Sequence, residues 1–571
     1  MPKVSVIVPV YGHAEYVLDS LESVFAQTYH DFEVIVVNDG SPDESESVLD
    51  GYIQSCKIKY IRQFNAGVAA ARNHGLAVAA GEYIAFLETI SIFESLVNME
   101  KMINRFFGST IWNFTKAFAS IWGIMAMMAT LIGAEAKALK GSKPNIIVIM
   151  PDDSGYGNHS CFGNPVIKTP NIDTLKEQSL LLTQYHSSAR CSPSRAKLLS
   201  GRHEFMSGVT HTVQGRERLS LDTITLPQAL KTAGYATGIF GKWHNGKAGP
   251  YRPENRGFDV SWVYEKGSRM KATISHNGNP KRMDGTYPTD LFFNKATEWM
   301  NVQRQTKKPF FVYLPPKSPH GPYKADSSDM PNEDYKKFLG SHPEMTVQVA
   351  KIYWEVEYID KRIGEMIQQL EEWGIADNTL FIFIGSDNGA SGTTKIYNAG
   401  MNGQKGHPYQ GGTRVPAFFR WPGGGIKGGV ECTTLISQMD IMPTLLEITG
   451  TPMTDQLKQQ VEGRSLIPIL KNPATDWEDD RHLVHHVGAW EPGQAAQSKH
   501  KRVSIQNKRF TLVNNKKGEE LFDLKNDPGE TKNVINEYPE VVAQLRAVYD
   551  KWWIKVQSRL VNEDAYQSSV E

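Results

Sequence analysis

The sequence has no excess charge of either sign, because its 62 Lys and Arg residues equal its 62 Asp and Glu residues. Such a chain has no global field that attracts nucleic acid or an anionic membrane, so any anion recognition must be local. Cysteine is scarce: the four residues Cys56, Cys161, Cys191 and Cys432 are widely separated and match no zinc-binding spacing. They form two disulfides at most, which leaves the redox compartment open. The chain also lacks low-complexity tracts and repeats of fixed period.

Length and composition are those of a large soluble protein with several domains. A chain of 571 residues exceeds one ordinary domain and suggests about two to four. Apolar residues make up 40% and charged residues 22%, which is normal for a globular protein with a large core.

The first block, residues 1–88, predicts strands that alternate with helices. The apolar run at 4–10 indicates a buried strand, and further strands are expected at 32–37 and 83–87. Helical periodicity lies between them, first near 15–26. Alternating strands and helices indicate a parallel sheet, here a partial Rossmann-like βαβ fragment.

A second alternating pattern begins at residue 143 and predicts an α/β domain with a mostly parallel sheet. Strand-like and helical runs lie at 144–150, 238–240, 310–314, 347–373 (helical) and 380–384. After about residue 470 the pattern changes to shorter strand-like pieces and a last helix at 539–556. We therefore predict a catalytic domain over 143–470 and a smaller subdomain over 471–571. Loops at 262–283 and 325–345 are expected to set specificity.

The segment between the blocks, residues 102–138, resembles a secretory signal peptide. Basic residues precede an uncharged run at 117–134, and small residues two apart follow it at 134–138. Met102 would be its natural first residue. The alternatives are a buried helix or a single membrane anchor, since 18 uncharged residues reach the lower limit for spanning a bilayer. A signal peptide predicts export to the periplasm or outside, an anchor predicts membrane attachment, and an extension that blocks export predicts a cytoplasmic protein.

Acidic and amide side chains follow two of the expected strands. Asp152 and Asp153 come after the strand at 144–150, and Asp387 and Asn388 come after the strand at 380–384. Ligands in α/β sheets bind beyond the carboxyl ends of the strands, and these oxygen donors suit calcium or magnesium. Taken singly, each pair is better interpreted as turn residues.

A cysteine-containing motif, Cys191-Ser-Pro-Ser-Arg195, lies between the two acidic pairs. Pro193 fits the first turn of a helix, which would place Cys191 at the positive end of the helix dipole. That position suits an anion. From the residues alone, Cys191 is either reactive or simply a small buried residue.

This motif, followed by Ser200-Gly-Arg202, resembles the signature of the sulfatases, in which the cysteine is oxidised to formylglycine. Further family motifs follow in order: Gly241-Lys-Trp-His244, Pro319-His320, Lys405-Gly406, Gly411-Gly-Thr-Arg-Val-Pro416, Met439-Asp-Ile-Met-Pro-Thr444 and Leu521-Phe-Asp-Leu-Lys-Asn-Asp-Pro-Gly-Glu530. Such an ordered set is very unlikely by chance. The resemblance implies a mixed sheet of the sulfatase and alkaline-phosphatase type, flanked by helices, with a C-terminal antiparallel sheet and helix.

The resemblance also implies a reaction, hydrolysis of an aryl or carbohydrate sulfate ester. Calcium would be bound by Asp152, Asp153, Asp387, Asn388 and the formylglycine made from Cys191 by a formylglycine-generating enzyme. One hydroxyl of the formylglycine hydrate attacks sulfur and displaces the alcohol, and the other then expels sulfate.

Five further residues receive roles from the same resemblance. Arg195, Lys242 and Lys405 would neutralise the sulfate oxygens, His320 would protonate the leaving oxygen, and His244 would hold or deprotonate the hydrate. Lys242 and Lys405 depend on their motifs, since a lone lysine is usually a surface residue.

Two alternatives remain beside this function. Phosphonate and phosphate ester hydrolases share the fold, and a catalytically dead binding protein is disfavoured by the retained nucleophile, metal set and acid. A sulfated polysaccharide is the substrate that family analogy suggests. One departure from the family is Gln410, where a glutamate is common, and we expect it to affect loop support or substrate choice. For His407, close to Lys405, a surface position is expected.

The first block resembles the start of an inverting family-two glycosyltransferase. The matching motifs are Pro9-Val-Tyr11, Val37-Asn-Asp-Gly-Ser41, Asn65-Ala-Gly67 and Ala71-Arg-Asn73, and Asp39 would lie near the nucleotide base. The Asp-x-Asp motif expected after the strand at 83–87 is replaced by Glu88-Thr-Ile90. Both this metal site and the acceptor half are missing, so transferase activity is not expected. The fragment is either a real fusion or an over-extended reading frame.

Overall fold

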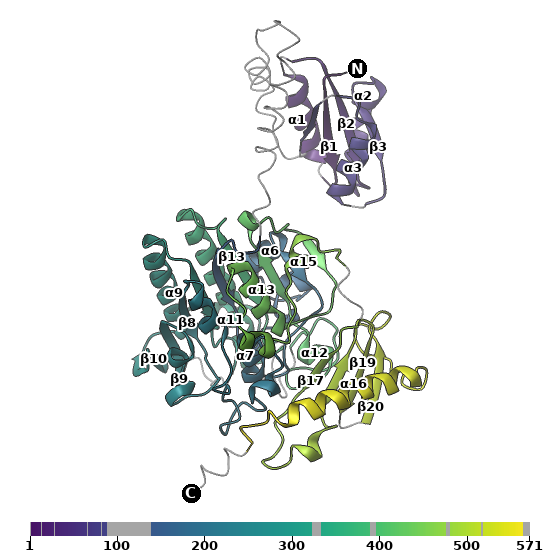
Figure 1. Ribbon diagram of the computed structural model, residues 1–571. Coiled ribbons are helices and arrows are strands. Elements are labelled where there is room, and N and C mark those ends of the chain that lie inside the picture. The colour runs from purple at the N-terminus through teal and green to yellow at the C-terminus, as the bar shows by residue number, and fades with distance from the viewer. Residues whose placement is uncertain are drawn as a thin grey trace, which may run out of the picture. The chain divides into compact units, whose positions relative to one another are not determined.

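The computed structural model describes residues 2–87, 139–321, 333–388, 396–475, 480–515 and 518–563, together with Met330 and apart from positions 13, 28, 66 and 82. The chain divides into two compact units, 1–128 and 129–571 (Figure 1). The signal-like segment at 102–138 lies outside the described residues. No described helix has the length and apolar character needed to span a bilayer.

The N-terminal unit is a four-stranded sheet in the order β3-β2-β1-β4, and every pairing in it is parallel. The two central strands supply most of its core, because all seven residues of β1 are buried. Along the chain the strands alternate with connecting helices, which is the βαβ arrangement expected from the sequence. The elements are β1 (Val4–Val10), α1 (Ala14–Phe25), β2 (Phe32–Asn38), α2 (Ser45–Gln54), β3 (Lys59–Arg62), α3 (Val68–Val78) and β4 (Tyr83–Phe86).

The second unit contains a ten-stranded mixed sheet in the order β11-β10-β9-β8-β12-β5-β13-β14-β6-β15. Its centre is parallel: β5 lies between β12 and β13, and β8 pairs with β12. Fully buried apolar runs, such as the five residues of β5, suit strands covered on both faces. The strands are β5 (Asn145–Ile149), β6 (Leu180–Leu182), β8 (Ala236–Gly241), β9 (Val260–Ser268), β10 (Lys271–His276), β11 (Asn279–Asp284), β12 (Phe310–Leu314), β13 (Thr379–Ile384), β14 (Ala417–Arg420) and β15 (Val430–Cys432).

Helices cover both faces of this sheet and form two separate cores. One face packs against α7 (Cys191–Ser200), α8 (Leu226–Thr232), α13 (Ile441–Thr449) and α15 (Ile467–Lys471). The other packs against α6 (Pro170–Glu177), α9 (Pro288–Gln305) and α11 (Val347–Glu372). Shorter elements are β7 (Tyr185–His186), α10 (Glu333–Ser341), α12 (Gln410–Thr413), β16 (Ile436–Ser437) and α14 (Asp455–Gln460). This is the α/β architecture with a mixed sheet that the sequence predicts.

The C-terminal part is an antiparallel sheet in the order β17-β18-β19-β20 that packs against one long helix. Its elements are β17 (Leu483–His486), β18 (Val503–Gln506), β19 (Phe510–Asn515), β20 (Gly518–Asp523) and α16 (Pro539–Gln557). The expected antiparallel sheet and final helix are therefore present.

One expectation is wrong. The segment 262–283, expected to be a loop, forms most of the antiparallel strands β9, β10 and β11. Asn277 and Gly278 make a tight turn between β10 and β11 with φ of 46° and 83°, a conformation that Asn-Gly adopts readily. Of the second expected loop, 325–345, the residues Glu333–Ser341 form α10.

Candidate active site

The candidate residues meet because four neighbouring parallel strands end at the same edge of the sheet. Asp152 and Asp153 follow β5, and Asp387 and Asn388 follow β13. Lys242 and His244 follow β8, and His320 follows β12. The strands are adjacent in the order β8-β12-β5-β13, so their carboxyl ends form one crevice. Cys191 enters this crevice as the first residue of α7.

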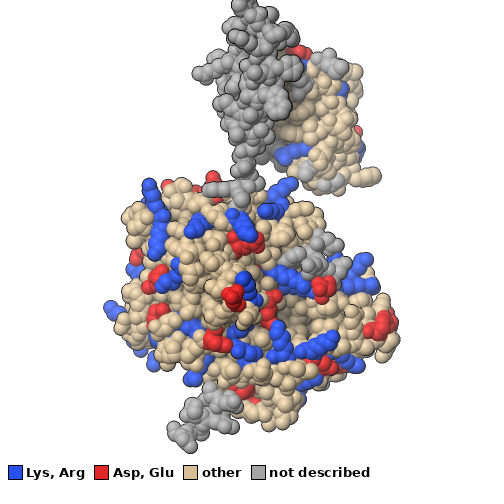
Figure 2. All heavy atoms as spheres, viewed as in Figure 1, with Lys and Arg blue, Asp and Glu red and all other residues tan. Residues whose placement is uncertain are grey.

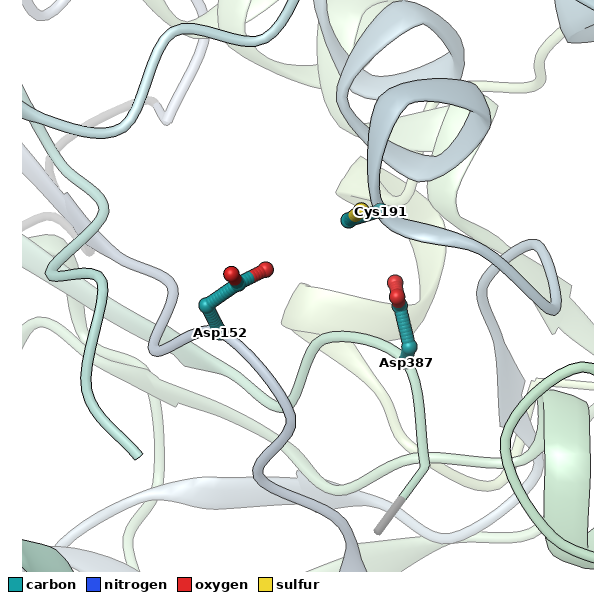
Figure 3. A group of neighbouring side chains, drawn as sticks. All are labelled: Asp152, Cys191 and Asp387. Atoms are coloured by element: carbon teal, nitrogen blue, oxygen red, sulfur yellow. The ribbon is translucent and has the colours of Figure 1, made fainter. Parts of the chain in front are cut away.

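Acidic oxygen atoms surround the cysteine. Two groups of possible metal ligands lie here, and in each the ligand atoms are within 4.8 Å of one another. The first group is Asp152, Cys191 and Asp387, and the second is Asp152, Asp153 and His320. Asp152 and Asp387 point toward Cys191 from the sheet edge (Figure 3). Asn388 donates its amide to the carbonyl of Arg414 at 2.7 Å, which leaves its buried Oδ1 without a partner. Three carboxylates and an unpartnered amide oxygen are hard donors that fit calcium or magnesium.

Three cations interleave with these carboxylates. Arg195 Nη2 lies 3.1 Å from Asp152 Oδ1, and Lys242 Nζ lies 2.6 Å from Asp152 Oδ2. Lys405 contacts Asp153 and lies 3.2 Å from Asp387 Oδ2. These charges act unequally on the carboxyl groups.

The two adjacent aspartates differ in their pKa values. Burial would raise the pKa of Asp152, but Lys242, His320 and Arg195 outweigh it and hold the pKa well below the usual value. Burial raises the pKa of Asp153 to about 6 despite Lys405, and the charge of Asp152 adds to the rise. An added positive charge at this site, such as that of a metal ion, would therefore favour the ionised form of both carboxyl groups.

Cys191 is 3% exposed, and its Sγ lies 3.2 Å from Nδ1 of His244. His244 Nε2 lies 2.9 Å from the carbonyl oxygen of Thr212, which assigns the ring proton to Nε2 and leaves Nδ1 as the acceptor facing Cys191. Burial, followed by Lys242, keeps the pKa of His244 well below its ordinary value. Burial also raises the pKa of the Cys191 thiol, so an unmodified thiol is poorly activated here. In a formylglycine hydrate, an oxygen would stand where Sγ lies.

His320 follows β12 and lines the cavity beside Asp153. Its Nδ1 donates to the carbonyl of Gly321 at 2.5 Å, and its Nε2 lies 3.9 Å from Asp153 Oδ2. Burial lowers the pKa of His320 to about 3. Nε2 is thus the nitrogen that faces the site.

A cavity of about 540 Å³ opens onto the cysteine. Five of the predicted residues line it, and so do several that the sequence reasoning missed. The added residues include Arg190, Lys247, Arg252, Tyr264, Glu265 and Lys317. Arg190 could have been noticed as the residue directly before the motif, whereas Tyr264 and Glu265 reach the site only through the unexpected strand β9. Elsewhere, Lys and Arg alternate with Asp and Glu over the face seen in Figure 2.

All of the predicted site residues, from Asp152 to Lys405, therefore lie around this one crevice. Gln410 lies outside it, in α12, and is buried. Its backbone N–H donates to Glu530 Oε2 at 2.8 Å and its side chain donates to Gln506 at 2.9 Å, so it joins α12 to the C-terminal sheet.

Three family models match parts of the chain. The family model described as Sulfatase matches residues 144–451, and that described as N-sulphoglucosamine sulphohydrolase, C-terminal, matches 404–552. The model described as Glycosyl transferase family 2 matches residues 5–89.

Relatives and solved structures are similar over the same part of the chain. Human N-acetylgalactosamine-6-sulfatase is 32% identical over 365 residues, which cover 57% of this chain and 66% of the relative. N-acetylgalactosamine-6-O-sulfatase of Bacteroides thetaiotaomicron is 28% identical over 503 residues, covering 73% and 96%. The crystal structure of Ps i-CgsB in complex with k-i-k-neocarrahexaose superposes with a TM-score of 0.63 at 23% identity, covering 75% of this chain and 98% of that one.

Proposed function

Because the chain belongs to the sulfatase family and is a sulfuric ester hydrolase, we propose that it removes sulfate from a carbohydrate with formylglycine at position 191 and a calcium ion. Relatives named for N-acetylgalactosamine 6-sulfate suggest a 6-O-sulfated amino sugar as the first substrate to test. The observation that carries the proposal is the environment of Cys191. One buried sulfur atom faces the acceptor nitrogen of a histidine and lies among carboxylates that are paired with three cations.

The residues around position 191 have separable tasks. Calcium held by Asp152, Asp153, Asp387 and Asn388 would act as a Lewis acid toward the sulfate ester. Formylglycine supplies, as its hydrate, the nucleophilic hydroxyl that an unmodified cysteine lacks. His244 accepts the proton of that hydroxyl at Nδ1, because Nε2 is bound to the Thr212 carbonyl.

Lys242, Lys405 and His320 act on the sulfate oxygens and on the departing sugar oxygen. Lys242 and Lys405 line the cavity and neutralise sulfate oxygens, while Arg195 is fully buried behind them and holds Asp152. His320 directs Nε2 into the cavity toward the departing sugar oxygen. Its ring proton lies on Nδ1 and its pKa is low in the free site, so it acts as the acid once the bound anionic ester has raised that pKa and Nε2 has taken up a proton. The alternative within the superfamily is a phosphonate ester hydrolase.

The test is sulfate release, measured by ion chromatography, from N-acetylgalactosamine 6-sulfate, with the 4-sulfate as a positional control. The protein is co-expressed with a formylglycine-generating enzyme, its proposed maturation partner, and assayed with calcium. Release from the 6-sulfate that is lost in Cys191→Ala but kept in Cys432→Ala supports the proposal. Cys432 is a suitable control because it is buried in β15, outside the cavity. Hydrolysis of a phosphonate monoester in place of both sugar sulfates would refute it.

We also propose that the segment at 102–138 directs export, as its signal-like pattern suggests. N-terminal sequencing of the secreted protein tests this. A mature chain that begins near residue 139 supports export with cleavage, and an intact chain retained in the cytoplasm contradicts it.

A further inference from the structure

The cavity holds more positive charge than the scissile sulfate requires. Besides Lys242 and Lys405, four cationic side chains line it: Arg190, Lys247, Arg252 and Lys317. Two of the four are already engaged. Arg252 pairs with Glu254 at 2.6 Å and with Glu265 at 3.1 Å, and Lys317 donates to the carbonyls of His320 and Gly321.

Arg190 differs from these residues. Among the described residues, its side chain has no ion pair and no hydrogen bond, and its Nε is buried without a partner. Asp387 attracts it electrostatically but forms no ion pair with it. Arg190 is half-buried, so its guanidinium is partly desolvated without a paired carboxylate to offset that cost.

A second arginine lies beside Arg190. Arg502, which directly precedes β18 of the C-terminal sheet, donates from Nη2 to the carbonyl of Gly406 at 2.5 Å, and Gly406 lines the cavity. Burial lowers the pKa of Arg502, and repulsion from Arg190 lowers it further. His211, the third basic residue here, has a pKa lowered to about 4 by burial and by the nearby arginines, so it stays neutral. Two like charges thus lie close together, Arg190 in the lining of the cavity and Arg502 directly behind Gly406.

The backbone holds Arg190 next to the reacting residue. Arg190 is extended, with φ of −146° and ψ of 152°, and its carbonyl accepts hydrogen bonds from both the N–H and the Oγ of Ser194. It directly precedes Cys191 and lines the same cavity, so an anion bound by its guanidinium would share that cavity with the scissile sulfate.

We propose that the substrate carries a second anionic group beside the scissile sulfate, and that Arg190 and Arg502 bind it. This inference rests on the proposed function and specifies its substrate as a polyanionic carbohydrate. The second group is a carboxylate or another sulfate, since a guanidinium fork binds either through charge-assisted hydrogen bonds.

Equilibrium binding tests the inference without turnover. In the Cys191→Ala protein with calcium, isothermal titration compares N-acetylgalactosamine 6-sulfate with N-acetylgalactosamine 4,6-disulfate and with a glucuronate-linked 6-sulfated disaccharide. Hydrogen bonds to a charged group contribute about 1.5–3 kcal/mol, so the preferred doubly charged ligand should bind about 10- to 100-fold more tightly. The disulfate and the uronate disaccharide identify which anion is recognised.

Arginine variants in the same Cys191→Ala background assign the effect. Arg190→Gln and Arg502→Gln should reduce the preference to about threefold or less, Arg190→Lys should retain part of it, and Arg282→Gln should leave it intact. Arg282 is a matched control because it is exposed on β11 and pairs with Asp284. Equal affinity for singly and doubly charged sugars would overturn the inference, as would an Arg190→Gln effect of equal size on every ligand.

Titration of inorganic sulfate into each variant tests the proposed function separately from the role of Arg190 and Arg502. Failure of sulfate to bind the Cys191→Ala protein contradicts the proposed function itself. Sulfate binding without a preference for the second anion contradicts only the role of Arg190 and Arg502. Retained sulfate binding in the arginine variants also shows that they are folded.

Discussion

Replacing Glu355 should damage both the stability of the large unit and the position of His320. Glu355 lies in α11, is completely buried, and accepts hydrogen bonds from Tyr287 Oη and Arg269 Nη2, each at 2.8 Å. The same Arg269 Nη2 lies 2.8 Å from the carbonyl of His320 and donates to it. The Glu355 carboxylate therefore positions Arg269, and Arg269 in turn positions the backbone of His320, the proposed acid.

The magnitude follows from burial of the pair, whose side chains are 6% and 0% exposed. Glu355→Gln keeps the shape but removes the carboxylate charge that pairs with Arg269, and breaking a buried pair in this way costs about 3–5 kcal/mol. A surface pair is worth about 0–1 kcal/mol, so Glu298→Gln, which breaks the exposed pair with Lys295, is the matched control.

A double variant separates stability from catalysis. Replacing both charges, in Arg269→Met with Glu355→Leu, removes the charge left by the single variant and should recover much of the lost stability. It does not restore the donor to the His320 carbonyl, so kcat should stay low. Stability is followed by the denaturant midpoint of tryptophan fluorescence and kcat by sulfate release. A Glu355→Gln midpoint equal to that of Glu298→Gln, or a double variant with full kcat, would refute this reasoning.

Three further predictions follow from the same site and its surroundings. His320→Ala should lower kcat for a sugar sulfate by about 100-fold or more, but by much less for 4-nitrophenyl sulfate, whose leaving group needs no proton; equal losses would exclude the acid role. Removal of metal by a chelator should abolish sulfate release, and added calcium should restore it; activity that survives chelation in metal-free buffer would contradict the metal assignment. Burial raises the pKa of Glu530 to about 8, so the folded state favours its protonated form and the free energy of unfolding should fall as pH rises from about 5 to 8. Glu530→Gln should remove this fall, as measured by denaturation at several pH values, and an unchanged pH profile would show that Glu530 is not its source.

The parallel centre of the sheet was predictable because its strands are continuous apolar runs. β5 and β13 are buried along their whole length, so periodicity and length suffice to identify them. The antiparallel strands at the edge of the sheet lack such runs. For example, β11 is mostly exposed and contains Pro, Lys and Arg. Only Asn277-Gly278 indicates a turn there.

The reacting centre was predictable because motif order and strand ends place its residues together. Asp152 and Asp387 follow adjacent strands, and Cys191 begins a helix as Pro193 indicates. The walls of the cavity were not predictable in the same way. Tyr264 and Glu265 line the cavity only because β9 packs beside β8, and Arg502, which precedes β18, reaches the Gly406 carbonyl only through tertiary packing. No local pattern contains that information.

The measurement that tests the central claim most directly compares the rate of sulfate release with the fraction of residue 191 present as formylglycine. Preparations made with graded amounts of the formylglycine-generating enzyme are analysed by mass spectrometry and assayed with calcium on one sulfated sugar. The account predicts a rate proportional to the aldehyde fraction, with no activity at zero. Undiminished release from protein that contains only the unmodified thiol would contradict it.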